Sequence, residues 1–241
     1  MNIHSFLADD DQQSQQYNFV LNSTNKAQEH RKNDRSEPTL GDSYLRSFAF
    51  RLAQEGDYTE AIALLTQLIY RHPYNAVDYN NRGLIYFQSG ETQKALYDYN
   101  TALKFNPNLA SAYNNRANYY ATCGELAAAL ADYDQAIDFN PCHIRAWINR
   151  GITWRDLGKY DQAIENFEVA LLFGQLEAHI WAERGRTYHL WGDWNYAVAD
   201  YRRALTQLPS IGNSKDITGY RLRLQLENWL NELLSDQRPI W

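Results

Sequence analysis

The sequence predicts an all-α fold of the solenoid class, built from five helical hairpins in tandem. Three observations carry this prediction: a glycine column, an alanine column and a proline column recur with one common step of 34 residues. A fixed period of this length marks a supersecondary unit that is stacked on copies of itself. The chain has 241 residues, 44% of them hydrophobic, so such an array can bury a continuous core.

The three columns keep their register, without insertion or deletion, over residues 42–210. The glycines are Gly56, Gly90, Gly124, Gly158 and Gly192. The alanines are Ala61, Ala95, Ala129, Ala163 and Ala197. The prolines are Pro73, Pro107, Pro141 and Pro209, with Gln175 in the fourth unit's place. The repeats are therefore expected at residues 42–75, 76–109, 110–143, 144–177 and 178–211.

The first unit shows how the pattern specifies a hairpin. Apolar residues from Leu45 to Leu52 recur at helical spacing, and Gly56 then supplies the residue type that a helix C-terminus favours for a left-handed turn. A second helical pattern begins near Ala61 and ends at Pro73, which cannot continue a helix. Position 8 of every unit is small, so the two helices are expected to cross closely there. The residues at position 8 are Ala49, Gly83, Ala117, Gly151 and Gly185.

Aromatic residues concentrate at positions 4, 11, 17, 24 and 30, where they are expected to pack the core. At position 24 they are Tyr99, Tyr133, Phe167 and Tyr201. Together with the glycine, alanine and proline columns, this pattern resembles the tetratricopeptide repeat (TPR) family. The stretches NNRG, NNRA and INRG look like those of TPR proteins common in bacteria, cyanobacteria included. The resemblance implies a right-handed α-solenoid whose first helices line a concave, protein-binding surface.

The two ends of the chain differ from the repeats. Residues 1–41 form a polar arm, which is expected to be flexible or partly helical, or to dock on the repeats or on a partner. Residues 212–241 are expected to hold a capping helix, from about Ile217 to Leu234, and a tail. Its apolar stripe consists of Leu222, Leu226, Trp229, Leu230 and Leu233. A solenoid needs a terminal element with a polar outer face, and this helix fits that requirement.

No catalytic or cofactor-binding motif is recognisable, so no enzyme activity, cofactor or metal is predicted. His179 and Glu183 lie four residues apart on one helix, but a metal site needs three or four converging ligands. The net charge of −6 argues against binding nucleic acid, and no apolar run is long enough to span a membrane. Cys123 and Cys142 fall at opposite ends of one hairpin and are not expected to pair. A cytoplasmic protein is expected.

Asparagine recurs on the expected concave face. Position 6 holds Asn81, Asn115 and Asn149, which look like the asparagine ladder of the O-linked N-acetylglucosamine transferase superhelix. Such amides can bond the peptide groups of an extended ligand. The alternative is that they bond to neighbouring helices or to water. The predicted partner-binding residues are Asn80, Asn81, Asn114, Asn115, Asn118, Arg145, Asn149, Arg155 and Arg186.

The concave positions also carry more basic than acidic residues, which favours an acidic or phosphorylated partner segment. The basic residues are Arg46, Arg145, Arg155 and Arg186, and the acidic ones are Asp156 and Glu183. The carboxylate clamp of heat-shock co-chaperones is incomplete, because His179 and Glu183 replace two of its basic residues. The predicted function is a non-catalytic scaffold, adaptor or assembly factor for another protein. The alternative is a self-associating module that uses the Trp-rich fourth and fifth repeats or the arm.

A further column places arginine at position 7, where the TPR pattern usually has leucine. These residues are Arg82, Arg116, Arg150 and Arg184. Sixteen residues later, position 23 holds Asp98, Asp132, Asn166 and Asp200. Because a buried arginine must be paired, the two columns predict a structural ladder rather than a binding site.

Overall fold

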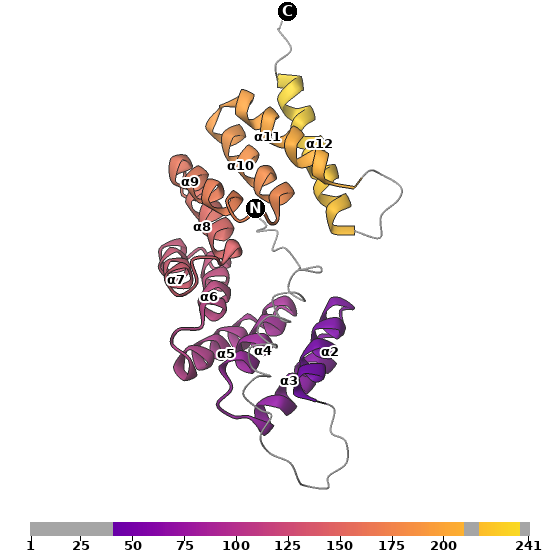
Figure 1. Cartoon of the computed structure of the whole chain (residues 1–241), viewed down its shortest axis with the longest axis vertical. Helices are drawn as coiled ribbons and strands as arrows, with labels where there is room; N and C mark the ends of the chain where they lie inside the picture. Colours follow the sequence, from indigo (N-terminus) through magenta and orange to yellow (C-terminus); the bar gives the residue numbers. More distant parts are fainter. Residues whose placement is uncertain (1–40, 210–216, 237–241) are drawn as a thin grey trace, which may run out of the picture. The chain divides into compact units, whose positions relative to one another are not determined.

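The computed structural model describes residues 41–209 and 217–236. Within those residues the fold is all-α, as predicted, with eleven helices and no strand. The helices are α2 (Asp42–Gln54), α3 (Tyr58–Arg71), α4 (Ala76–Gln88), α5 (Thr92–Phe105), α6 (Ala110–Thr122), α7 (Leu126–Phe139), α8 (Ile144–Asp156), α9 (Tyr160–Leu171), α10 (Glu177–Trp191), α11 (Trp194–Gln207) and α12 (Ile217–Asp236). Consecutive helices form hairpins, as α2–α3 and α10–α11 show in Figure 1. The predictions for the arm and the C-terminal tail fall on residues outside the described part.

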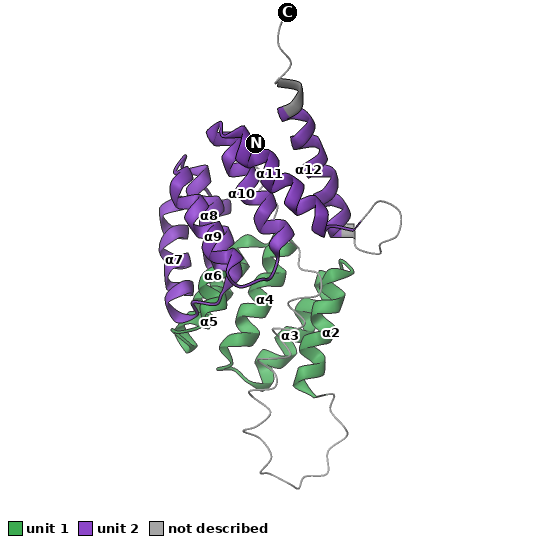
Figure 2. Ribbon diagram, turned by 45° about the horizontal axis from the view of Figure 1, so that its top comes forward, with its two compact units in different colours: residues 1–115 green, residues 116–241 purple. Residues whose placement is uncertain are grey.

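The chain divides into two compact units (Figure 2). Unit 1 ends at Asn115 and unit 2 begins at Arg116, so the division falls within α6. Unit 1 therefore contains the hairpins α2–α3 and α4–α5. Unit 2 contains α7, α8–α9, α10–α11 and α12. No helix in the described residues combines the length and the hydropathy that crossing a membrane requires.

Each hairpin turns at the predicted glycine. The five glycines of this column, from Gly56 to Gly192, have φ between 71° and 89°. This left-handed conformation suits glycine because a Cβ atom would be strained there. The glycine column is thus explained by the backbone of the turn, and the prediction is confirmed.

Small residues at position 8 allow the two helices of a hairpin to touch. A Cβ atom added to Gly185 would lie 2.8 Å from the ring of Tyr201, and one added to Gly151 would lie 2.9 Å from the ring of Phe167. Both rings are completely buried. The predicted close crossing is confirmed, and it is filled by the aromatic residue at position 24.

We expect Gly185→Val to destabilise the protein by about 1–3 kcal/mol, because the added side chain overpacks the contact with Tyr201. Gly41→Val is the matched control, since nothing lies within 4 Å of a Cβ atom built there. Denaturant unfolding of the two variants measures the difference. Equal unfolding midpoints would show that the helices can separate without cost.

The fourth repeat ends differently from the others, where glutamine replaces the expected proline. Helix α9 has 12 residues, whereas α7 has 14. The chain then passes through Gly174 at φ 64° and Leu176 at φ 55°, and Leu176 is the one non-glycine residue with positive φ in the described part. Since left-handed leucine is uncommon, the connection into α10 is an irregular one that the repeat pattern did not predict.

The capping helix α12 packs on the last hairpin, as predicted. Leu226 and Leu233 are buried in the core cluster that contains Tyr201, and Trp229 stacks on the ring of Tyr201 at 5.6 Å between centroids. Charged residues such as Glu232 lie on the exposed side. The helix therefore closes the hydrophobic core of unit 2.

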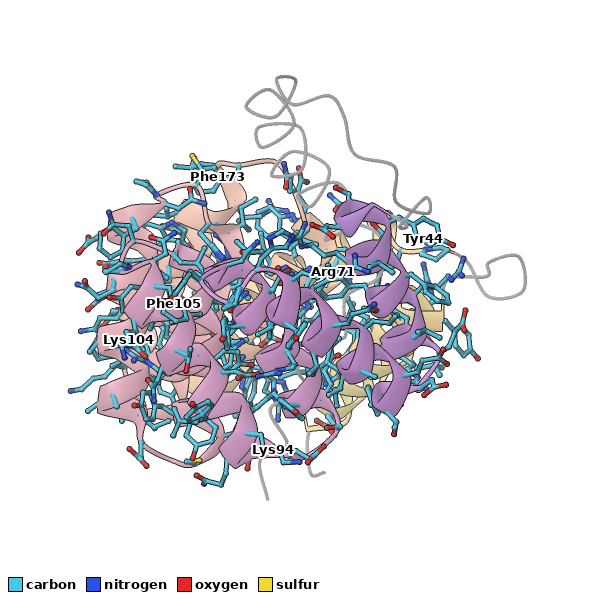
Figure 3. All side chains as sticks on the ribbon, turned by 90° about the horizontal axis from the view of Figure 1, so that it is seen from below. Tyr44, Arg71, Lys94, Lys104, Phe105 and Phe173 are labelled. Carbon is cyan, nitrogen blue, oxygen red and sulfur yellow. The ribbon has the colours of Figure 1, made fainter. Side chains whose placement is uncertain are left out.

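Unit 1 shows the same aromatic packing at its connections. The ring of Phe105, at the end of α5, lies 5.5 Å from the rings of both Tyr74 and Tyr79. Figure 3 shows Phe105 beside Lys104 at this helix end, and Tyr44 on the outer side of α2. Tyr44 is 52% exposed. Phe105, at position 30, thus packs against the connections on both sides of its repeat, whereas Phe139 at the same position of the next repeat is 41% exposed and corrects the expectation that this column packs in the core.

Candidate partner-binding site

The arginines of position 7 are structural. Arg184 donates from Nε and Nη2 to the two carboxylate oxygens of Asp200, at 2.7 and 3.0 Å. Arg82 does the same with Asp98, at 2.7 and 2.8 Å. The pair Arg116–Asp132 has the same bidentate geometry. Because each pair joins the two helices of one hairpin, the predicted ladder is confirmed.

The fourth repeat keeps this arrangement with an amide. Arg150 Nε donates to Oδ1 of Asn166 at 2.7 Å, and its Nη1 donates to Asp134 of the preceding repeat at 2.6 Å. The guanidinium of Arg150 also lies 4.5 Å from the ring centroid of Trp147. Arg150 is therefore held by hydrogen bonds and by an aromatic face, which gives the tryptophan three residues before it a structural role.

The asparagines of unit 1 are largely enclosed. Asn81 is fully buried, and Asn80 and Asn114 are each 4% exposed. Nδ2 of Asn115 donates to Oδ1 of Asn80 at 3.0 Å, and Nδ2 of Asn114 donates to Oδ1 of Asn115 at 3.3 Å. Amides on α4 and α6 thus bond to one another, which is the alternative that the sequence left open.

A second pair of amides lies in unit 2. Asn149 Nδ2 donates to Oδ1 of Asn118 at 3.0 Å, and the hydroxyl of Tyr133 donates to the same oxygen at 2.6 Å. Asn118 and Asn149 are both partly exposed. Because both amides reach solvent, contact with a partner stays a prediction for both residues.

Charged side chains gather where α8 and α10 face each other. This α8–α10 cluster consists of Arg145, Arg155, His179, Glu183 and Arg186. Nη1 of Arg155 donates to Oε2 of Glu183 at 2.5 Å. Burial alone would raise the pKa of Glu183, but the positive groups around it, Arg155 with its charge and its hydrogen bond foremost, together hold this pKa below its ordinary value.

His179 is the unusual member of the cluster. It is 8% exposed, and neither ring nitrogen has a hydrogen-bond partner within the described residues. Burial lowers its pKa, and the charges of Arg145 and Arg155 lower it further, against the opposing charge of Glu183. A buried imidazole of this kind is neutral near pH 7 and can still offer one donor and one acceptor.

The two remaining predicted arginines differ in their surroundings. Burial lowers the pKa of Arg145 to about 10, because removal from water destabilises the charged guanidinium. Arg186 is more open: its guanidinium lies 5.0 Å from the ring centroid of Trp229 and within 3.9 Å of the exposed Glu232. The charges of Arg145 and Arg155 act on His179, and those of Arg155 and Arg186 act on Glu183, so the structure brings the three arginines into one cluster.

One basic residue of the predicted concave face is neutralised. Arg46 donates to both carboxylate oxygens of Asp78, at 2.6 and 2.9 Å, and Asp78 is fully buried. Asp78 occupies position 3, which the sequence pattern did not include among the concave positions. The excess of positive charge inferred from the sequence must therefore be corrected downward, and it does not extend to Arg46.

The described residues contain no group of three or more His, Cys, Asp and Glu side chains that could hold a metal ion. Cys123 and Cys142 are both free thiols at exposed positions.

A half-buried histidine makes stability depend on pH. Nδ1 of His143 accepts a hydrogen bond from the backbone N–H of Ala146 at 3.2 Å and so caps α8. Burial lowers the pKa of His143 to about 4, whereas an unfolded histidine has a pKa of about 6.5. Between these values the unfolded chain binds the proton that the folded chain excludes, so stability falls as the pH falls.

We expect this loss between pH 6.5 and 4 to be on the order of 1–3 kcal/mol for His143. His143→Asn should reduce it, because asparagine can cap a helix without titrating, as Asn75 does for α4. Urea unfolding at pH 7 and pH 5 measures both proteins. The explanation would be wrong if the variant lost as much stability as the original protein.

These features define a tandem helical-hairpin protein with polar first helices. TPR family models match residues 40–73, 83–122, 109–140 and 144–172. The chain belongs to the tetratricopeptide repeat family, which supports a protein-interaction scaffold. No curated protein matches the chain.

Solved structures show the same fold. A thermophilic TPR protein of Thermus thermophilus is 21% identical with a TM-score of 0.68, over 79% of this chain and all of that one. A crystal structure of MamA is 22% identical with a TM-score of 0.56, over 66% of this chain and 92% of that one. A TPR protein of Parabacteroides merdae is 22% identical with a TM-score of 0.59, over 81% of this chain and 77% of that one. At these identities the likeness shows the fold alone.

Proposed function

We propose that the protein is a non-catalytic scaffold that holds a segment of another protein against its first helices. The observation that carries the proposal is the α8–α10 cluster. It combines arginines that are only partly covered with a buried imidazole whose nitrogens have no partner among the described residues. The buried nitrogens of His179 would be stabilised by a ligand that supplies their missing hydrogen bonds.

The cluster favours an acidic segment. Burial removes part of the water that would stabilise the charge of Arg145. A carboxylate of the partner would stabilise this charge instead, through charge-assisted hydrogen bonds. Arg186 is partly exposed on the same helix as His179, so a partner can reach it from solvent. The negative charge of Glu183 is already paired with Arg155, so it repels a carboxylate of the partner only weakly.

The asparagines add a second kind of contact. Asn118 and Asn149 are bonded to each other, and both side chains are partly exposed. Partly exposed amides could also bond the peptide groups of an extended segment, whatever its side chains. The fully buried Asn81 would contribute by holding its helix in place.

Selection from a displayed library of random peptides tests the proposal. The original protein should enrich peptides that contain two or more acidic residues, and the Arg145→Glu variant should not enrich them. Light scattering over a range of concentrations accompanies the selection. A constant monomer mass supports a separate partner over self-association, and enrichment of neutral or basic peptides would contradict the acidic segment.

A further inference from the structure

An aromatic pocket opens at the turn between α10 and α11. Trp191, Asp193, Trp194 and Asn195 line an open cavity of about 440 Å³ around Gly192. Trp191 is 47% exposed and Trp194 is 42% exposed. Two exposed tryptophans that line one pocket are uncommon on a protein surface that only faces water.

The other repeats show that the backbone of the turn does not need these rings, although the ring of Trp191 also lies 6.1 Å from that of Tyr160 in the preceding repeat. All five turns share the same left-handed glycine, so they provide matched backbones. The residues at the position of Trp191 are Glu55, Ser89, Cys123 and Leu157, and those at the position of Trp194 are Tyr58, Thr92, Leu126 and Tyr160. Position 17 was expected to pack in the core, and the exposure of Trp194 corrects that expectation for the fifth repeat.

The carboxylate in the pocket is not used by the fold. Asp193 is the N-cap residue of α11, but its side chain makes no capping hydrogen bond. Asp57, at the same position of the first repeat, accepts a hydrogen bond from the backbone N–H of Glu60 at 3.2 Å. In the part of the chain that the structure describes, no ion pair reaches the Asp193 side chain either, so its charge remains open to a ligand.

Three other tryptophans of this chain lie beneath an arginine. The guanidinium groups of Arg150 and Arg184 lie 4.5 and 4.6 Å from the ring centroids of Trp147 and Trp181, respectively. Arg186 lies over Trp229 in the same way. Over the described residues, no arginine or lysine is placed on Trp191 or Trp194 in this way.

We propose that this tryptophan pocket receives an arginine side chain of a partner protein, which stacks on an indole ring and pairs with Asp193. Arginine is favoured over lysine because its planar guanidinium can stack and donate to a carboxylate at the same time. A protein partner is favoured by the net charge of −6, which attracts a basic segment and repels nucleic acid.

The N-terminus of α11 opposes a cation, but more weakly than Asp193 attracts it. A helix N-terminus carries the equivalent of roughly half a positive charge, whereas the carboxylate carries a full negative charge at the same place. The balance therefore favours a cation. The pocket lies at the hairpin turn and is a second contact, independent of the acidic segment proposed for the α8–α10 cluster.

The test follows the indole N–H signals of ¹⁵N-tryptophan-labelled full-length protein by NMR. The probe is the capped peptide acetyl-Ala-Arg-Ala-Arg-Ala-amide, and its control is the same peptide with citrulline, which keeps the shape but not the charge. The chain has seven tryptophans, and Trp191→Phe and Trp194→Phe assign the two pocket signals. These two should shift in a saturable way with the arginine peptide, while the signals of Trp147 and Trp181 stay in place.

Asp193→Asn should weaken the interaction about threefold or more, because it removes the charge and keeps the shape. Asp57→Asn, the same change in the first repeat, should leave the affinity unchanged. Equal shifts with the citrulline peptide, or no effect of Asp193→Asn, would overturn the proposal. Shifts of the two pocket signals with protein concentration alone would assign the pocket to a second copy of the chain and would also overturn it.

Discussion

Replacing Asp200 by alanine is expected to destabilise the protein by about 3–5 kcal/mol, because it leaves a buried arginine without its carboxylate. Asp200 is 1% exposed and Arg184 is 9% exposed. Glu168 lies 3.3 Å from Arg184 Nη1, but it is mostly in solvent and can replace only part of the lost interaction. Urea unfolding of the full chain, followed by tryptophan fluorescence, measures the change.

The chain provides its own control for this experiment. In the fourth repeat Asn166 occupies the place of the aspartate and accepts a hydrogen bond from Arg150 at 2.7 Å. Asp200→Asn should therefore keep one hydrogen bond to Arg184 and lose clearly less stability than Asp200→Ala. If the two variants were equally stable, the ladder would not act through hydrogen bonds to the arginine.

Leu226→Ala is expected to cost about 2–5 kcal/mol, because it opens a cavity in the core that α12 closes. Leu226 is completely buried and belongs to the same cluster as Tyr201 and Leu233. The matched control is Leu224→Ala on the same helix, where the side chain is 39% exposed and the cost should stay below about 1 kcal/mol.

Unfolding of the two leucine variants also tests the capping role of α12. If α12 were only loosely attached, both substitutions would leave the unfolding midpoint unchanged. A large difference between them shows that one face of the helix holds the last hairpin together. Because Trp229 of α12 stacks on Tyr201, its fluorescence should then change in the same transition as the unfolding of the last hairpin.

Features that repeat in the sequence could be predicted because each depends on contacts within one hairpin. The left-handed turn at Gly192 requires a residue without a Cβ atom, whatever surrounds it. The pair Arg184–Asp200 is fixed by a separation of 16 residues across one turn. The stripe of α12 was equally readable, since helical periodicity alone assigns Leu226 and Leu233 to the buried face.

Contacts between repeats were not predictable in the same way. The bond between Asn80 and Asn115 and the neutralisation of Arg46 by Asp78 depend on how neighbouring first helices align. Periodicity predicts which side of a helix faces inward, but not which polar atoms meet. The 42% exposure of Trp194 is a third case, because periodicity alone does not predict which side chains cover a residue at a turn.

The central claim is that the first helices α8 and α10 bind an acidic segment. The most direct measurement is the affinity of one selected acidic peptide, by fluorescence anisotropy, for the original protein and two charge reversals. Arg145→Glu lies in the α8–α10 cluster, and Arg202→Glu lies on an exposed part of α11. We expect Arg145→Glu to weaken binding at least about tenfold and Arg202→Glu to leave it within about twofold. Equal effects of the two reversals would contradict the claim.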